Sequence, residues 1–132
     1  MILLDTHILV WLDKGSRQLG KETRIELDKS LQKNALAVSA ITFWELAMLV
    51  NKGRIELPPI RRWRSELLNM GLIEIPIDGA CGIHANELVD FHPDPADRLI
   101  VATAIENDAT LATADERILN WSEGMSRLDG RV

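Results

Sequence analysis

Short apolar runs alternate with amphipathic segments along this chain, a pattern typical of a domain in which strands and helices follow one another. Buried strands are expected at residues 2–4, 35–38, 72–77 and 109–112, with a final short strand at 125–128. Helices are expected at residues 6–12, 21–33, 60–68, 78–89 and 94–105, with one more ending at 50 and another opening at 113–116. This alternation predicts an α/β fold with three layers, α/β/α, around a central, mainly parallel sheet of four to five short strands.

The length of the chain limits how many domains it can form. Residues 1–132 suffice for a single domain with its own hydrophobic core. Glu74 and Pro76 interrupt the third expected strand, so this strand should lie toward the periphery of the sheet. The longest apolar stretch, residues 35–50, contains Ser39, Thr42 and Glu45 and is too short and too polar to cross a bilayer. We therefore expect no membrane association.

Composition excludes several classes of protein. The lone cysteine, Cys81, rules out a disulfide framework and a cysteine metal site, and it fits a reducing, cytoplasmic location. The first residues lack a basic start and read as a strand, so no signal peptide is expected. A net charge of -5 argues against a simple basic nucleic-acid binder. It does not exclude a metal-dependent one, because a divalent cation makes a carboxylate pocket electropositive.

Residues 92–119 carry the strongest functional signal. Asp94 is expected to cap a helix that has Pro95 at its first position and Asp97 in its first turn. That helix leads into the strand at 109–112, which Asp115 follows. A helix runs antiparallel to the strand that it leads into, so Asp97 and Asp115 should be neighbours at one edge of the sheet.

Two further acids should reach the same edge. Asp5 follows the first strand directly, and Glu45 lies on the helix after the second strand. Each acid also has a purely structural interpretation, since carboxylates cap helices. For Glu45 this interpretation is a capping box with Thr42, which requires a late helix start, whereas a cap at Ser39 leaves Glu45 among apolar neighbours and in need of a cation. His7 is assigned to a helix surface or a supporting position, because a single histidine is a weak ligand signal.

Four carboxylates gathered without matching Lys or Arg would repel one another. Hard oxygen ligands are what Mg²⁺ or Mn²⁺ prefers, so a divalent-metal site is the simplest explanation. Open α/β sheets bind ligands at the carboxyl ends of their strands, where these acids are expected. The sequence contains no glycine-rich phosphate loop and no serine or cysteine nucleophile arrangement.

A basic strip lies in the middle of the chain, around Trp63. Its members are Lys52, Arg54, Arg61, Arg62 and Arg64. The strip could contact RNA or an acidic segment of a partner protein. Alternatively it is a solvated helix face with Trp63 packed inward.

The chain resembles the PIN-domain family, and within it the VapC-like toxins of bacterial and archaeal toxin–antitoxin pairs. The resemblance is carried, in order, by residues 3–7 (LLDTH), 39–45 (SAITFWE), 94–104 (DPADRLIVATA) and 113–115 (TAD). It implies a Mg²⁺-dependent endoribonuclease that leaves 5′-phosphate and 3′-hydroxyl ends. It also implies an antitoxin that blocks the acidic pocket and a homodimer formed by apolar helix faces such as residues 41–50.

The resemblance also assigns roles to residues. It places Asp5, Glu45, Asp97 and Asp115 in the four acidic positions of the metal and catalytic site, and it makes supporting residues of Thr6, Thr113 and Asp94. Glu45 or Asp115 could orient or deprotonate the attacking water. Two alternatives stay open: another Mg²⁺-dependent phosphoryl-handling enzyme, and a catalytically idle module that binds a partner.

Overall fold

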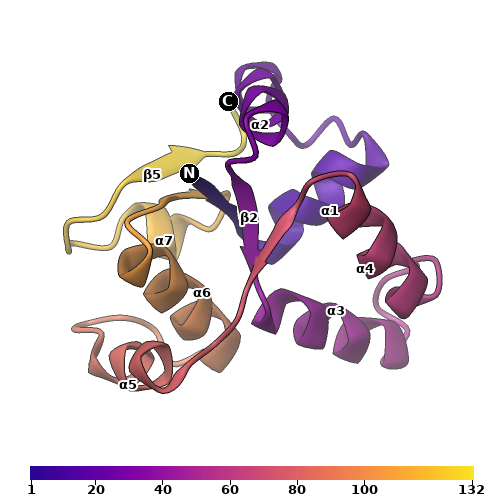
Figure 1. Ribbon diagram of the computed structural model, residues 1–132. Helices are drawn as coiled ribbons and strands as arrows, with labels where there is room; N and C mark the ends of the chain where they lie inside the picture. Colours follow the sequence, from indigo (N-terminus) through magenta and orange to yellow (C-terminus); the bar gives the residue numbers. More distant parts are fainter.

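A five-stranded sheet, with every neighbouring pair of strands parallel, forms the centre of the computed structural model, which describes residues 1–132 (Figure 1). The spatial order is β3-β2-β1-β4-β5. The strands are β1 (Ile2–Leu4), β2 (Leu36–Ser39), β3 (Ile73–Ile75), β4 (Thr110–Thr113) and β5 (Arg127–Asp129). The helices are α1 (Thr6–Lys14), α2 (Lys21–Gln32), α3 (Ile41–Asn51), α4 (Ile60–Asn69), α5 (Gly79–Glu87), α6 (Pro95–Glu106) and α7 (Glu116–Leu119).

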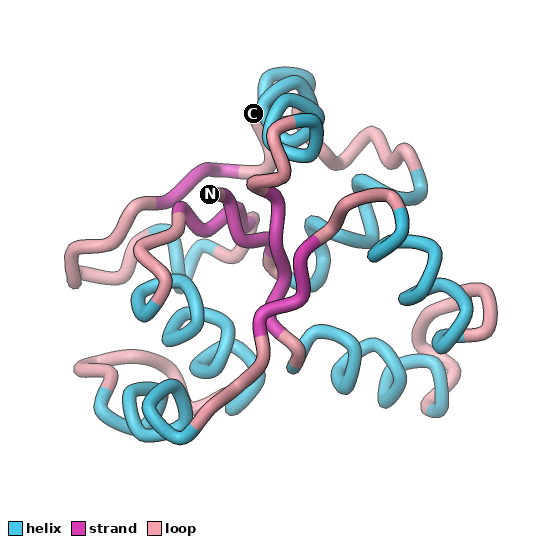
Figure 2. Tube along the Cα trace, viewed as in Figure 1, coloured by secondary structure: helices cyan, strands magenta, loops and turns pink.

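Helices cover both faces of the sheet, as Figure 2 shows by colour. Successive residues of a strand point to opposite faces. Thus Leu4 packs with α1, α2, α3 and α4 in one core cluster, whereas Leu3 packs with α6 and α7 in the other. Helix α5 lies outside this second layer and packs on α6 through Cys81 and Ala85. The predicted three-layer α/β/α architecture is confirmed.

The parallel arrangement brings the carboxyl ends of the strands to one edge. There β1 leads to Asp5, β2 leads through Ala40 into α3, and β4 leads to Asp115. Helix α6 runs antiparallel to β4, so its amino end and Asp97 lie at this edge too. The third strand is at the border of the sheet, as its Glu and Pro predicted.

The predicted starts of two helices were wrong. Helix α3 has Ala40 at its N-cap, and Ser39 only accepts a long hydrogen bond of 3.4 Å from the Ile41 amide. Thr42 lies inside the helix and makes no capping box with Glu45, because its hydroxyl contacts that of Thr6 at 3.0 Å. Helix α7 is capped by Asp115, whereas Thr113 belongs to β4. In both places a partner distant in sequence occupies the threonine hydroxyl.

Membrane crossing finds no support in the fold, because none of the helices combines enough length with enough apolar character to cross a bilayer.

Candidate metal centre

The carboxyl edge of the sheet holds a cavity of about 470 Å³ in which all the predicted acids meet. Its lining residues are Asp5, His7, Trp11, Glu45, Asp94, Asp97, Ala114, Asp115 and Arg117. Five of them are carboxylates and one is an arginine, so the lining is strongly acidic. The expectation that Asp97 and Asp115 lie close together is confirmed, since they offer oxygen atoms within 4.8 Å of each other.

Asp5 is held rigidly at the end of β1. It is 6% exposed, and its Oδ1 accepts a hydrogen bond of 2.8 Å from the Thr6 amide. Its Oδ2 accepts one of 2.7 Å from the Thr113 hydroxyl. Burial raises the pKa of Asp5, and the bond from Thr113 partly offsets that rise. Asp5 therefore caps α1 and faces the cavity at the same time.

Glu45 is the least compensated acid of the cavity. It lies one turn into α3, and its buried Oε1 has no hydrogen-bond partner. Burial raises the pKa of Glu45; the Thr6 side chain partly offsets that rise, and the nearby charge of Asp5 adds to it. A buried carboxylate oxygen without a donor is unfavourable, so this atom is available for a cation or for a proton.

Asp97 lies in the first turn of α6 and is paired with His92. Its Oδ2 lies 2.6 Å from His92 Nε2, and the two side chains are 14% and 13% exposed. Burial raises the pKa of Asp97 to about 6. His92 was not among the predicted site residues; the one signal in the sequence is its place five residues before Asp97 and next to Pro93.

Asp115 is paired with a second residue that the sequence did not identify. Arg117 contacts both of its carboxylate oxygens, through Nε at 3.2 Å and Nη2 at 2.9 Å. This guanidinium holds the pKa of Asp115 below its usual range. Arg117 Nη2 also lies 3.7 Å from Asp97 Oδ2, so one exposed arginine bridges two of the acids.

The expected supporting residues differ in what they contact. Thr113 donates directly to Asp5, as described above. Thr6 offers its amide to Asp5, while its hydroxyl pairs with Thr42. Asp94 caps α6 by accepting from the Asp97 amide at 3.0 Å, and it also lines the cavity.

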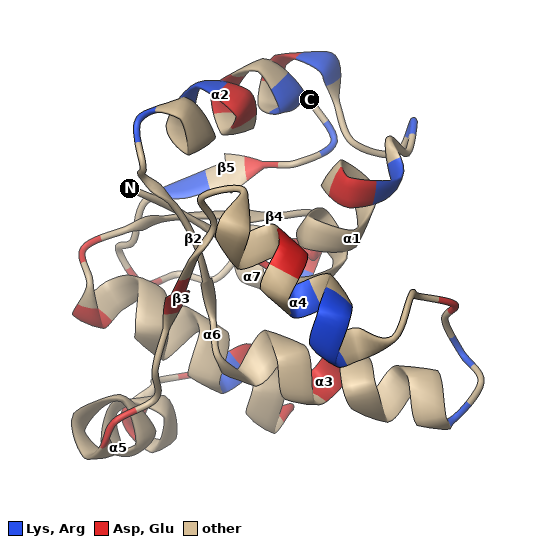
Figure 3. Ribbon diagram, turned by 45° about the vertical axis from the view of Figure 1, so that its right-hand side comes forward, with Lys and Arg blue, Asp and Glu red and all other residues tan.

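The basic strip lies on α4 and on the loop after α3, outside the acidic cavity (Figure 3). Arg64 is bound to Glu74 through two hydrogen bonds of 2.8 and 2.6 Å, and Arg62 lies 3.6 Å from Glu66. Trp63 is packed inward at 3% exposure, as the structural interpretation expected. The members without an ion pair are Lys52, Arg54 and Arg61.

The donor set suits a hard divalent cation. It consists of carboxylates with the imidazoles of His7 and His92 beside them, and it leaves the buried Glu45 Oε1 without a hydrogen-bond partner. His92, Asp97 and Asp115 offer ligand atoms within 4.8 Å of one another, and Asp5 and Glu45 line the same cavity without belonging to that cluster.

Comparison with known proteins identifies the family. The model of the PIN domain matches residues 2–123. The chain belongs to the PIN-domain family. This PIN domain is 34% identical over 119 residues to "Ribonuclease VapC22" of Mycobacterium tuberculosis, a match that covers 89% of this chain and 88% of that protein.

Solved structures share the fold of this PIN domain. VapBC2 from Rickettsia felis, bound to a DNA fragment from its promoter, matches with a TM-score of 0.68 at 23% identity, covering 97% of this chain and 98% of that one. A toxin–antitoxin complex from Klebsiella pneumoniae gives 0.66 at 20% identity, and FitAcB from Neisseria gonorrhoeae gives 0.65 at 22%. These two matches cover 98% of each chain.

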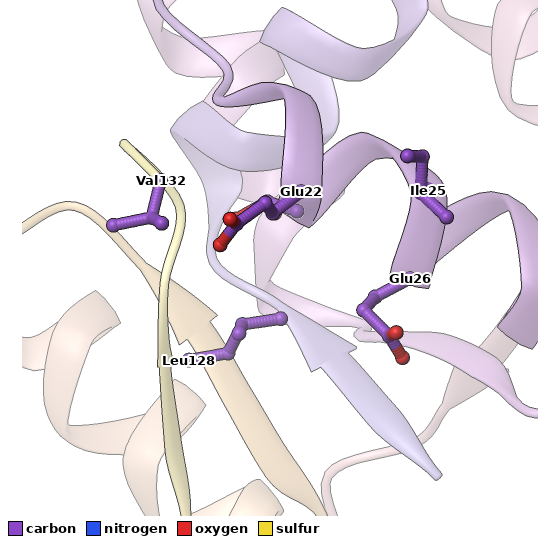
Figure 4. A pocket seen from close by; sticks show the side chains of 6 residues that line it. Glu22, Ile25, Glu26, Leu128 and Val132 are labelled. Atoms are coloured by element: carbon purple, nitrogen blue, oxygen red, sulfur yellow. The ribbon is translucent and has the colours of Figure 1, made fainter.

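Another cavity of this PIN domain, of about 330 Å³, lies between α2 and the C-terminal strand (Figure 4). Its carboxylates, Glu22 and Glu26, lie on one helix beside the apolar Ile25, Leu128 and Val132. No residue of the acidic set reaches it, so the chemistry is assigned to the edge of the sheet.

Proposed function

We propose that this PIN domain is a divalent-metal-dependent endoribonuclease and the toxin of a toxin–antitoxin pair. The observation that carries the proposal is the convergence of Asp5, Glu45, Asp97 and Asp115 on one cavity, where a buried Glu45 oxygen lacks any donor. Mg²⁺ or Mn²⁺ is the fitting ion, because carboxylate oxygens are its preferred ligands. The relative named Ribonuclease VapC22 supports RNA as the substrate.

The chemistry divides between the ion and the protein. A bound ion would polarise the scissile phosphodiester and lower the pKa of the attacking water. The protein fixes the ligands in advance: the Thr6 amide and Thr113 hydroxyl orient Asp5, and Asp97 is in contact with His92 at 2.6 Å.

Glu45 is the better candidate for the group that accepts a proton from the attacking water. Asp115 uses both of its oxygens for Arg117, which lowers its basicity. Glu45 has a raised pKa and a free Oε1, and both properties make it the stronger proton acceptor of the two. The expected products carry 5′-phosphate and 3′-hydroxyl ends.

The partners follow from the same proposal. The fold neighbours from Rickettsia felis and Klebsiella pneumoniae are toxin–antitoxin assemblies, which supports a cognate antitoxin whose segment blocks the acidic cavity. We further propose a homodimer that uses the exposed face of α3, where Trp44 is 59% exposed. Lys52, Arg54 and Arg61 are the strip residues free to contact RNA or the antitoxin. A cytoplasmic location fits these partners.

A catalytically idle module is the competing hypothesis, because Asp5, Asp94 and Asp115 each cap a helix. The unpartnered Oε1 of Glu45 argues against it, since an idle module has no use for a buried carboxylate oxygen without a donor.

Cleavage of RNA by purified protein tests the proposal. Asp5→Asn and Asp97→Asn should each abolish Mn²⁺-dependent cleavage, because each removes ligand charge without a change in volume. Asp108→Asn is the matched control: it lies just beyond the far end of α6, at a positive φ of 50° that Asn tolerates well. Sequencing of the cleaved ends from wild type and Asp97→Asn gives the product chemistry. Undiminished cleavage by Asp5→Asn would overturn the assignment.

A further inference from the structure

We propose that His92 is itself a metal ligand, so that the centre is a mixed nitrogen and oxygen site that prefers Mn²⁺ to Mg²⁺. This inference builds on the proposed function and names the ion that the site is made for. It concerns a residue outside the set of four acids.

The ligand atoms are already gathered. His92, Asp97 and Asp115 each offer one atom, and these atoms all lie within 4.8 Å of one another. An ion with ligands at about 2.1 Å places opposite ligands roughly 4.2 Å apart and adjacent ones roughly 3 Å apart. His92 Nε2 and Asp97 Oδ2, at 2.6 Å, therefore need to separate by only a few tenths of an ångström to become adjacent ligands.

The imidazole is fixed by contacts on its own loop. It stacks on Phe91 with ring centroids 4.4 Å apart and an interplanar angle of 26°, and Phe91 packs edge-on against Trp121. Arg98, which lies on α6, holds this loop in place. It donates to the carbonyl oxygens of His92 at 3.0 Å and Phe91 at 2.7 Å.

These contacts orient His92 Nε2 toward the carboxylates. His92 is mostly buried, so the ring is not a mobile surface group that happens to lie near Asp97. Ligands that are locked by their surroundings bind metals more tightly than free ones, because little order is lost on binding. Arg98 and Phe91 are thus positioning residues for His92.

The type of ligand atom determines which ion the site prefers. Mg²⁺ is held by oxygen ligands and keeps several waters, whereas Mn²⁺ shares the preference for carboxylates but, as a first-row transition ion, accepts an imidazole nitrogen more readily. Replacing one oxygen ligand by nitrogen therefore shifts selectivity toward Mn²⁺. The same contact could instead be an outer hydrogen bond in which Nε2–H only orients Asp97. The two arrangements differ in whether nitrogen bonds to the ion.

Pulsed electron paramagnetic resonance of Mn²⁺-loaded wild-type protein decides between them. A nitrogen bonded directly to Mn²⁺ gives a modulation of the echo, which changes when the protein is labelled with ¹⁵N-histidine. The chain has three histidines, so assignment needs few variants. We expect the nitrogen signal in wild type, in His84→Gln and in His7→Gln, and its loss in His92→Gln. His7→Gln is the most informative control for His92→Gln, because His7 lines the same cavity.

Metal titration supplies an independent result. His92→Gln keeps a donor for Asp97 but loses the imidazole, so its Mn²⁺ affinity should fall by about tenfold or more, and its Mg²⁺ affinity much less. His84→Gln should match wild type for both ions. Melting of the metal-free variants checks that they are folded. Where His92→Gln does not fold, persistence of the nitrogen signal in both His7→Gln and His84→Gln still assigns it to His92.

Two results would overturn the inference: Mn²⁺ bound to wild type without a histidine nitrogen signal, or a signal that disappears in His7→Gln but survives in His92→Gln. An unchanged Mn²⁺ affinity of folded His92→Gln would do the same. Failure of the proposed nuclease looks different, because wild type would then not cleave RNA, whatever its Mn²⁺ spectrum shows.

Discussion

Asp97→Asn should make the metal-free protein more stable at pH 7, even though it destroys the metal site. The carboxylate is 14% exposed and lies near other acids, so its ionised form is disfavoured in the folded state. An amide has the same shape without the charge. Stabilisation by removal of a functional group is expected wherever like charges are held together for binding.

The magnitude follows from the pKa. Burial raises the pKa of Asp97 from an ordinary 3.8 to about 6, which corresponds to about 3 kcal/mol of destabilisation when the group is ionised. Asn pairs less strongly with His92, which removes part of this gain. We expect a net stabilisation of about 1 to 3 kcal/mol, or a melting temperature higher by roughly 3 to 10 °C.

The dependence on pH has a definite sign. With its pKa raised on folding, Asp97 binds a proton more tightly in the folded state, so its favourable contribution is complete below pH 4 and is lost as pH rises through 6. The advantage of Asp97→Asn should therefore be absent near pH 4 and fully developed by pH 7.

Melting curves in EDTA and in Mn²⁺ at pH 4 to 7.5 test this reasoning, with Asp108→Asn as control. Wild type should gain about 2.7 kcal/mol when Mn²⁺ is present at 100 times its dissociation constant, whereas Asp97→Asn should gain much less. The difference in unfolding free energy between the two proteins then shrinks or changes sign when metal is added. A variant that is less stable than wild type in EDTA at pH 7, or that responds equally to Mn²⁺, would refute the argument.

Three further substitutions test the acidic cavity and the fold. Arg117→Gln should bind Mn²⁺ severalfold more tightly, since it removes a competing cation from both oxygens of Asp115 and leaves only the backbone amide of residue 117 on Oδ1; weaker binding in a calorimetric titration would contradict this. Gly20→Ala should destabilise the fold by about 1 to 3 kcal/mol, because a Cβ there would lie 1.9 Å from the backbone carbon of Val132. Gly82→Ala, in a helix with nothing within 4 Å, should instead stabilise by roughly 0.5 to 1 kcal/mol in the same thermal melts.

The convergence of the acids could be predicted because it depends on local patterns and one topological rule. Short apolar runs located the strands, and parallel strands place their carboxyl ends together. That sufficed to bring Asp97 to Asp115 and Asp5 to the same edge. The peripheral place of β3 followed from Glu74, which proved to be the partner of Arg64.

What the sequence could not show depends on contacts between distant residues. The threonine patterns at residues 42 and 113 look like capping boxes, yet both hydroxyls are used by long-range partners, Thr6 and Asp5. His92 and Arg117 were missed for a related reason. A histidine or an arginine near an acid in sequence is common, and only the fold reveals which carboxylate it contacts.

Compensation of charge in the acidic cavity is uneven, and the unevenness is itself informative. Asp97 has His92 and Asp115 has Arg117, while Glu45 Oε1 has nothing. A cavity that served only to cap helices would be stabilised by one more donor near α3, at no cost to the fold. Leaving that position open makes sense where a cation or a transferable proton is to occupy it, because stability is then exchanged for binding at the one place where binding is needed.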